Sequence, residues 1–317
     1  MSRSLSDYPS FTLRLTNLMI GLCRGAPGLP RALRELGYEG FWVELRFAIA
    51  GDKAVNPDMI VYSTEQRHTL LCEWKSGRNV EKDQLLRYGL VTDEDLRVRA
   101  HIPAAAAAAH DTTVFGVAEY RERLVLGLTA AESDAVLVVV DDEGLTRVGR
   151  RFAADGLNAA FAPRPAVDVA NAPLGFLPFD AESPDHVVAE HCIRQLVVYM
   201  NRREPLVRLS ALAQDVVSIW SVLPDDARKP LTDRMRDIMT EAARYEFRPY
   251  LHRERGIEGR TRTPTWGIAN NPLDLSTEKR TAAYRRLEAA QKGLVERLRS
   301  NGGRSQGELP LEFAESD

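Results

Sequence analysis

The chain has 317 residues, of which 44% are hydrophobic and 27% are charged. This balance is typical of a globular protein with a buried core and excludes wholesale disorder. At roughly 150 residues per domain, the length predicts about two domains. The 42 Lys and Arg residues and 45 Asp and Glu residues give a net charge of −3, which argues against a protein that coats nucleic acid through overall charge alone.

Cysteine usage and hydropathy predict the compartment. Cys23, Cys72 and Cys192 lie far apart, and an odd number of widely spaced thiols favours neither a disulfide framework nor a C-x2-C metal site. The longest apolar runs, such as 135–140, are much shorter than the roughly 18 residues that a membrane helix needs. We therefore expect a soluble cytoplasmic protein with no membrane partner.

The N-terminal part has the pattern of a strand meander followed by a helix. Apolar and polar residues alternate over 41–50, and two further apolar runs are separated by a polar connection, as expected for a hairpin. The expected elements in chain order are helical pieces within 11–37 broken by a turn at 25–28, strands at 41–50, 58–62 and 69–75, and a helix at 81–90.

The remaining chain is expected to be mainly helical after a proline-rich boundary at 162–184. Before this boundary we expect a helix at 117–131 and a strand at 135–140. After it we expect helices at 183–200, 208–222 and 225–244, short strands at 247–253 and 263–268, and a charged helix at 277–300. Three helices followed by two strands around a basic loop outline a winged helix, and a helical bundle with a frayed hairpin fits nearly as well.

These elements predict an α/β fold, with a mixed sheet flanked by helices in residues 1–180. A mainly helical domain, with the winged helix as its first candidate, is expected over 181–270. A charged helix and a polar tail are expected over 271–317.

One predicted hairpin brings charged side chains together. If the strands at 58–62 and 69–75 pair symmetrically, Asp58 lies opposite Glu73, with Cβ atoms roughly 4.5–5.5 Å apart. Lys75 shares the face of Glu73, because side chains alternate along a strand. The alternative is a hairpin whose terminal charges are solvated surface residues.

Two opposed carboxylates in an apolar hairpin repel each other, and a divalent cation would compensate for this repulsion. Ligands that are all oxygen favour Mg2+, which binds through one or two carboxylates and keeps several waters. Mn2+ is expected to substitute for it. With Lys75 close by, the chemistry expected is phosphodiester hydrolysis.

The string Pro57-Asp58, fourteen intervening residues, then Glu73-Trp74-Lys75 resembles the motif of the PD-(D/E)XK nuclease superfamily, which includes restriction-type endonucleases. The resemblance covers about residues 28–140. It implies a restriction endonuclease-like core, metal binding by Asp58, Glu73 and the backbone carbonyl of Trp74, and a Lys75 that assists the attacking water.

Further candidates come from the same resemblance. Gln84 and Tyr88 are four apart and share a helix face, as in the Q-x3-Y element of RecB-type members, although a chance pair on an amphipathic helix is an equal alternative. Many members also carry a glutamate on the first helix. Glu35 and its rival Glu44 are candidates for that position, and a surface charge is the alternative for each.

Charge is concentrated near the C-terminus. Residues 244–304 contain fourteen basic and seven acidic residues, a local net charge of +7, interleaved with aromatic residues. This pattern favours phosphate contacts, and a solvated helix laced with ion pairs is the alternative. The candidate nucleic-acid contacts are Arg248, Arg253, Arg255, Arg260 and Arg262. The tail at 306–313 loosely resembles peptides that dock in the bacterial sliding clamp, and an unstructured end is the alternative.

Together these observations predict a Mg2+-dependent DNA nuclease of the kind found in restriction, phage defence, repair or transposition. Expected partners are DNA and either a second copy of the chain or a multi-protein complex. One alternative is a non-catalytic winged-helix protein that binds DNA or acts as an adaptor. Another is a nuclease that acts on RNA.

Overall fold

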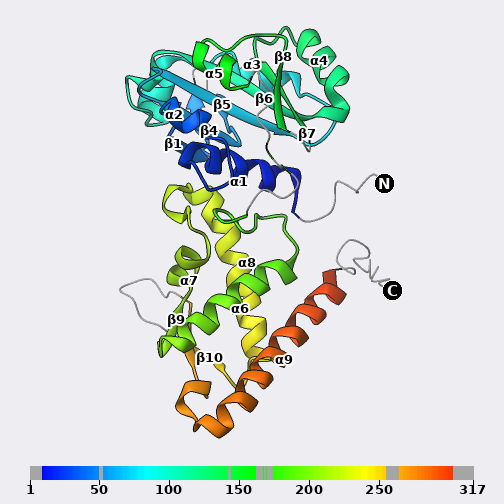
Figure 1. Ribbon diagram of the computed structural model, residues 1–317. Coiled ribbons are helices and arrows are strands. Elements are labelled where there is room, and N and C mark those ends of the chain that lie inside the picture. Colours follow the sequence, from blue (N-terminus) through cyan, green and yellow to red (C-terminus); the bar gives the residue numbers. More distant parts are fainter. Residues whose placement is uncertain are drawn as a thin grey trace, which may run out of the picture. The chain divides into compact units, whose positions relative to one another are not determined.

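The computed structural model describes residues 9–49, 53–141, 144–161, 167, 169, 174–254 and 264–302. The chain divides into two compact units (Figure 1). The first unit comprises Met1–Pro178 and Ser218–Arg228, and the second comprises Phe179–Val217 and Lys229–Asp317. Among the described residues, no helix is long and apolar enough to cross a membrane.

A mixed β-sheet forms the centre of the first unit. In the described part of this unit, six strands lie in the order β1 (Gly40–Val43), β4 (Met59–Ser63), β5 (His68–Lys75), β6 (His110–Val117), β7 (Val136–Asp141) and β8 (Gly144–Val148). The β1, β4 and β5 strands form an antiparallel meander, β5, β6 and β7 are parallel, and β8 returns antiparallel. The predicted α/β fold with a mixed sheet is confirmed.

The hairpin of β4 and β5 has the predicted register. Tyr62 lies opposite Thr69, and Ile60 lies opposite Leu71. Every residue of β5 except Lys75 is buried, so both faces of this strand are covered. Burial on both faces explains why β5 is an almost continuous apolar run in the sequence.

The prediction of a single strand over 41–50 is wrong. Glu44 has a φ of 53°, a left-handed conformation that does not continue an extended strand, and β1 ends just before it. The chain resumes as β2 (Phe47–Ile49), which pairs with β3 (Lys53–Val55) in a separate hairpin. Apolar residues alternate on both sides of the break, so periodicity alone does not reveal it.

Helices cover both faces of the sheet (Figure 1). On one face, α1 (Phe11–Arg24) contacts the sheet, and the indole Nε1 of Trp74 donates to the Thr16 hydroxyl at 3.1 Å. On the other face, α3 (Lys82–Tyr88) and α4 (Arg121–Ala130) contribute apolar side chains to one core cluster. The shorter helical elements of the first unit are α2 (Ala32–Glu35), α5 (Asp155–Ala160), a π-helical turn at Asp95–Arg99, and 3-10 turns at Ala106–Ala108, Ala118–Tyr120 and Trp220–Val222. The second unit has a 3-10 turn at Pro272–Asp274.

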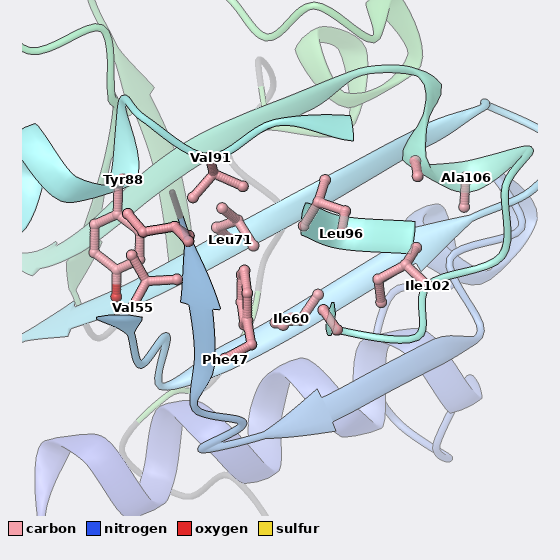
Figure 2. Close-up of a cluster of buried hydrophobic side chains, with 12 residues drawn as sticks. Phe47, Val55, Ile60, Leu71, Tyr88, Val91, Leu96, Ile102 and Ala106 are labelled. Carbon is pink, nitrogen blue, oxygen red and sulfur yellow. The ribbon is translucent and has the colours of Figure 1, made fainter. Parts of the chain in front are cut away.

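The small β2–β3 hairpin completes the core on the α3 face. Phe47 and Val55 from this hairpin pack in one cluster with Ile60, Leu71 and Tyr88 (Figure 2). Tyr88 is 1% exposed, so its ring is fixed by apolar neighbours and only its hydroxyl requires a polar partner.

The second unit is mainly helical, as predicted. Its elements are α6 (Asp185–Asn201), β9 (Leu206–Arg208), α7 (Leu209–Val216), α8 (Asp225–Arg244, whose first turn belongs to the first unit), β10 (Leu251–Glu254), β11 (Thr265–Ile268) and α9 (Thr277–Gly302). In its described part, β11 lies between β10 and β9 in an antiparallel sheet of three strands. The helix predicted over 208–222 is too long, because the extended backbone of Val217 ends α7.

Candidate metal-dependent active site

The strand register brings Asp58 next to Glu73. The β4–β5 ladder begins with Met59 opposite Cys72, so Asp58, one residue before Met59, falls level with Glu73. The amide N–H of Trp74 donates to Oδ2 of Asp58 at 2.6 Å. The predicted juxtaposition of these two carboxylates at the end of the hairpin is therefore present in the structure.

The backbone around Asp58 fixes its position. Its carbonyl oxygen accepts from the amide of Glu44 at 3.0 Å, which ties the end of β1 to the start of β4. An extended residue directs its N–H and its C=O to the same edge of the strand. Because the Trp74 amide faces Asp58, the Trp74 carbonyl is directed to the same side.

Glu73 joins three further polar side chains in one network. Its Oε1 lies 2.9 Å from Nζ of Lys75, and its Oε2 accepts from the Tyr88 hydroxyl at 2.8 Å. Nζ of Lys75 also donates to Oε1 of Gln84 at 3.0 Å. Glu73 and Lys75 come from the end of β5, whereas Gln84 and Tyr88 come from one face of α3. The structure thus places both residues of the predicted Q-x3-Y pair in direct contact with the Glu73–Lys75 pair.

Burial and like charge perturb the acid groups of this cluster. Desolvation, followed by the negative charge of Glu73, raises the pKa of Asp58 to about 7, against the opposing effects of the Trp74 amide and Lys75. Burial and the charge of Glu73 also raise the pKa of Tyr88, which therefore stays protonated and donates. At neutral pH the site holds a carboxyl that ionises readily when a cation arrives.

The two other candidate glutamates occupy different places. The charge of Glu44 contributes to the raised pKa of Asp58, so Glu44 lies close to the cluster. Glu35 is exposed on α2. The carbonyl of its neighbour Leu36 accepts from the hydroxyl of Ser63, at the far end of β4. At about 3.3 Å per residue, this end is roughly 16 Å from Asp58 along the strand, so the structure does not bring Glu35 to the site.

Among the candidate nucleic-acid contacts, Arg248 and Arg253 are exposed in the second unit. Arg255, Arg260 and Arg262 lie outside the described residues, as does the tail at 306–313. Part of the basic charge on α9 is neutralised. Arg297 binds both Glu241 and Glu246, Arg299 pairs with Glu190, and Lys292 pairs with Glu288.

Sequence reasoning missed the amide of Trp74 as the partner of Asp58. The predicted register contained a signal for it, because an aspartate just beyond the last ladder pair faces strand amides that have no partner in the ladder. It also missed a buried network at the opposite end of β5, where His68 bonds the Tyr38 hydroxyl at 2.9 Å and Asp111 at 3.0 Å. Tyr38 and Asp111 are 30 and 43 positions from His68, and no local pattern marks them.

Tyr88→Phe tests the polar role of this hydroxyl. The ring stays in its apolar cluster, but Glu73 loses one donor, so we expect a loss of about 1 kcal/mol in the free energy of unfolding. The metal-dependent DNA cleavage predicted from the sequence should fall about tenfold, because Glu73 loses its fixed orientation. Urea unfolding and a cleavage assay measure the two effects.

Tyr199→Phe is the matched control, because the Tyr199 hydroxyl also donates to a carboxylate, that of Asp215, at 2.7 Å. It should lose similar stability and keep full activity. Equal activity losses in both variants would show that Tyr88 acts only through stability.

Comparison with protein families finds that the model of the MJECL32 domain matches residues 12–161. The matched segment is just under half of the chain and contains β1 to β8, and with them all residues of the cluster. Comparison with curated proteins finds no match, and comparison with solved structures finds none either.

Proposed function

We propose that this protein is a divalent-metal-dependent nuclease that hydrolyses phosphodiester bonds in DNA. The observation that carries the proposal is the cluster at the end of the β4–β5 hairpin. There Glu73 contacts Lys75, and Asp58 binds the amide of Trp74, the residue between them. Acidic residues and a lysine clustered this closely on half-buried strand ends are costly for stability. They are expected where charge must be stabilised during a reaction.

The donors present fit Mg2+ or Mn2+. Asp58, Glu73 and the carbonyl of Trp74 offer only oxygen, the ligand that these hard ions prefer. Among the described residues, no group of three or more His, Cys, Asp or Glu side chains could hold a metal. A pair of carboxylates suits an ion that keeps several waters, whereas Zn2+ favours nitrogen and sulfur ligands. When bound, the ion would supply Lewis-acid chemistry to a phosphoryl group.

Lys75, Tyr88 and Gln84 would supply the other functions of the site. Lys75 is held by Glu73 and Gln84, so its ammonium group is fixed where it can orient a water or offset negative charge that develops on phosphate. Tyr88 stays protonated, and its hydroxyl donates a hydrogen bond that fixes the second oxygen of Glu73. Gln84 acts as a positioning residue, because its side-chain oxygen accepts from Lys75.

The order of elements in the first unit supports a restriction endonuclease-like core. Helix α1 precedes the antiparallel strands β1, β4 and β5, and α3 then leads to β6, which is parallel to β5. This is the order expected for a PD-(D/E)XK nuclease. The cluster lies on β5 and at the start of β4, where that superfamily places its motif.

The order of elements in the second unit supports the proposal of a winged helix that would bind DNA. This order is α6, β9, α7, α8, β10 and β11, with β11 central in the sheet. On α8, Arg236 pairs with Asp233 and Asp237, and Arg234 with Asp185. We therefore expect DNA contacts from Arg248, Arg253 and the basic segment 255–263 rather than from the face of α8 that these pairs occupy.

The test is cleavage of matched DNA and RNA substrates by the full chain with Mg2+ or Mn2+ and with EDTA. We expect metal-dependent cleavage of DNA, little cleavage of RNA, and cleavage at the background level for Asp58→Asn. Preferential cleavage of RNA would overturn the assignment of DNA as substrate. Salt-sensitive DNA binding without any cleavage by the wild type would favour the adaptor alternative.

A further inference from the structure

In the second unit, an arginine covers one face of an aromatic ring, and the other face is open. Tyr245 follows the last residue of α8 and is 52% exposed. The guanidinium carbon of Arg297 lies 4.7 Å from the centre of its ring. Since one ring face is covered by this cation, the exposed part of Tyr245 comes from the opposite face and the edges.

The covering arginine is itself fixed. Arg297 Nε and Nη2 bond the two carboxylate oxygens of Glu246, at 2.7 and 3.0 Å, and Nη1 bonds Glu241 at 2.8 Å. A bidentate pair of this kind has a defined geometry. The ring of Tyr245 is therefore pre-organised, and a ligand that stacks on it would not have to order it first.

Two exposed arginines flank the ring. Arg244 precedes Tyr245, and the amide of Arg248 donates to the Tyr245 carbonyl at 3.1 Å, so the three side chains leave the same turn of chain. Both glutamates beside the ring are already bound by Arg297. The charges of Arg244 and Arg248 therefore give this turn a local excess of positive charge.

We propose that Tyr245 is a stacking platform for an unpaired base of single-stranded DNA, with Arg244 and Arg248 contacting the adjacent phosphates. Aromatic rings within a basic surface bind single strands in this way, because every base has a π-face whereas the bases of a duplex are already stacked. The inference rests on the proposed nuclease function for its choice of DNA. It narrows the substrate to DNA with a single-stranded end or gap.

Binding of the full chain in EDTA tests this proposal without cleavage. The probes are a fluorescent oligonucleotide of about 12 nucleotides, a length within the range that one small binding surface covers, and a blunt duplex of the same sequence. We expect Tyr245→Leu, which keeps apolar bulk but removes the π-face, to weaken single-strand binding about tenfold. Tyr245→Phe and Tyr245→Trp should bind within about twofold of the wild type or more tightly, and duplex affinity should not change.

A charge-matched pair of double variants tests the arginines. Arg244→Ala with Arg248→Ala should weaken single-strand binding and reduce the slope of log affinity against log salt by about 0.7 for each phosphate that an arginine no longer neutralises. Arg285→Ala with Arg286→Ala removes two exposed arginines from α9 and should leave both the affinity and the slope unchanged.

The proposal is overturned if the wild type does not bind the single strand, or if Tyr245→Leu binds it as the wild type does. It is also overturned if Tyr245→Leu weakens single strand and duplex equally, because that result indicates a general charged surface. These binding measurements are made in EDTA, where no metal-dependent cleavage takes place. Failure of the nuclease proposal, which is measured by cleavage, is thus separate from failure of the platform, which is measured by binding.

Discussion

Lys75→Ala is expected to lower metal-dependent DNA cleavage by about 10²–10³-fold, the usual effect of removing one preorganised group that stabilises transition-state charge. Nζ of Lys75 is held between Glu73 Oε1 and Gln84 Oε1, at 2.9 and 3.0 Å, and its side chain is only 14% exposed. The variant keeps Asp58 and Glu73, so its affinity for Mn2+ should remain close to that of the wild type. Single-turnover cleavage and titration calorimetry with Mn2+ measure the two effects separately.

Lys292→Ala is the control for Lys75→Ala. Lys292 also pairs with a glutamate, Glu288, at 3.4 Å, but on an exposed helix surface, where such pairs contribute little. It should cleave as the wild type does. Wild-type cleavage by Lys75→Ala would remove this lysine from the mechanism, and loss of Mn2+ binding in step with cleavage would assign it to the metal scaffold instead.

The candidate site could be predicted from the sequence because it depends on one hairpin. Polar residues at 63–68 mark the turn, and the apolar runs on either side have nearly equal lengths, so symmetric pairing sets Ile60 opposite Leu71. Once that register is fixed, the period of two along β5 places Glu73 and Lys75 on one face. Gln84 and Tyr88 follow from the helical period, but the sequence alone could not bring α3 onto that face.

The remaining fold depends on interactions that leave little local trace. The break at Glu44 is a single left-handed residue in an otherwise alternating stretch. Strand β6 begins with His110, Asp111 and two threonines, a polar start that hides a central strand of the sheet. The polar start of β6 is half-buried because of tertiary contacts such as the hydrogen bond between Asp111 and His68. Strand propensity does not include such contacts.

The second large effect that we expect is a gain in stability when the negative charge of Asp58 is removed. The folded-state pKa of this carboxyl is raised to about 7 from an ordinary value near 3.8. Below about pH 4 the group is protonated in both states, so it does not affect the free energy of unfolding. As pH rises from about 4 to 7, the unfolded chain releases this proton but the folded chain retains it, so stability falls.

Above pH 7 the loss is complete and amounts to about 4 kcal/mol, from 1.36 kcal/mol for each pKa unit. Asp58→Asn removes this penalty, and the oxygen of the new amide can still accept from the Trp74 N–H. In EDTA at pH 8 we expect the melting temperature of the first unit to rise by roughly 10 °C. At pH 4 we expect the variant and the wild type to melt at nearly the same temperature. Calorimetric scans over this pH range measure the difference.

Asp111→Asn is the control for Asp58→Asn, because it shows whether removing any partly buried carboxylate of the first unit raises the melting temperature. Asp111 accepts from His68, which is 1% exposed, and from the Ala153 amide at 2.7 Å, so its loss should destabilise the fold. If Asp58→Asn lowers the melting temperature at pH 8 as Asp111→Asn does, the Asp58 carboxylate stabilises the fold and its proposed role loses its physical basis. If it raises the melting temperature and Mn2+ stabilises only the wild type, the cost of the buried charge is offset by the cation.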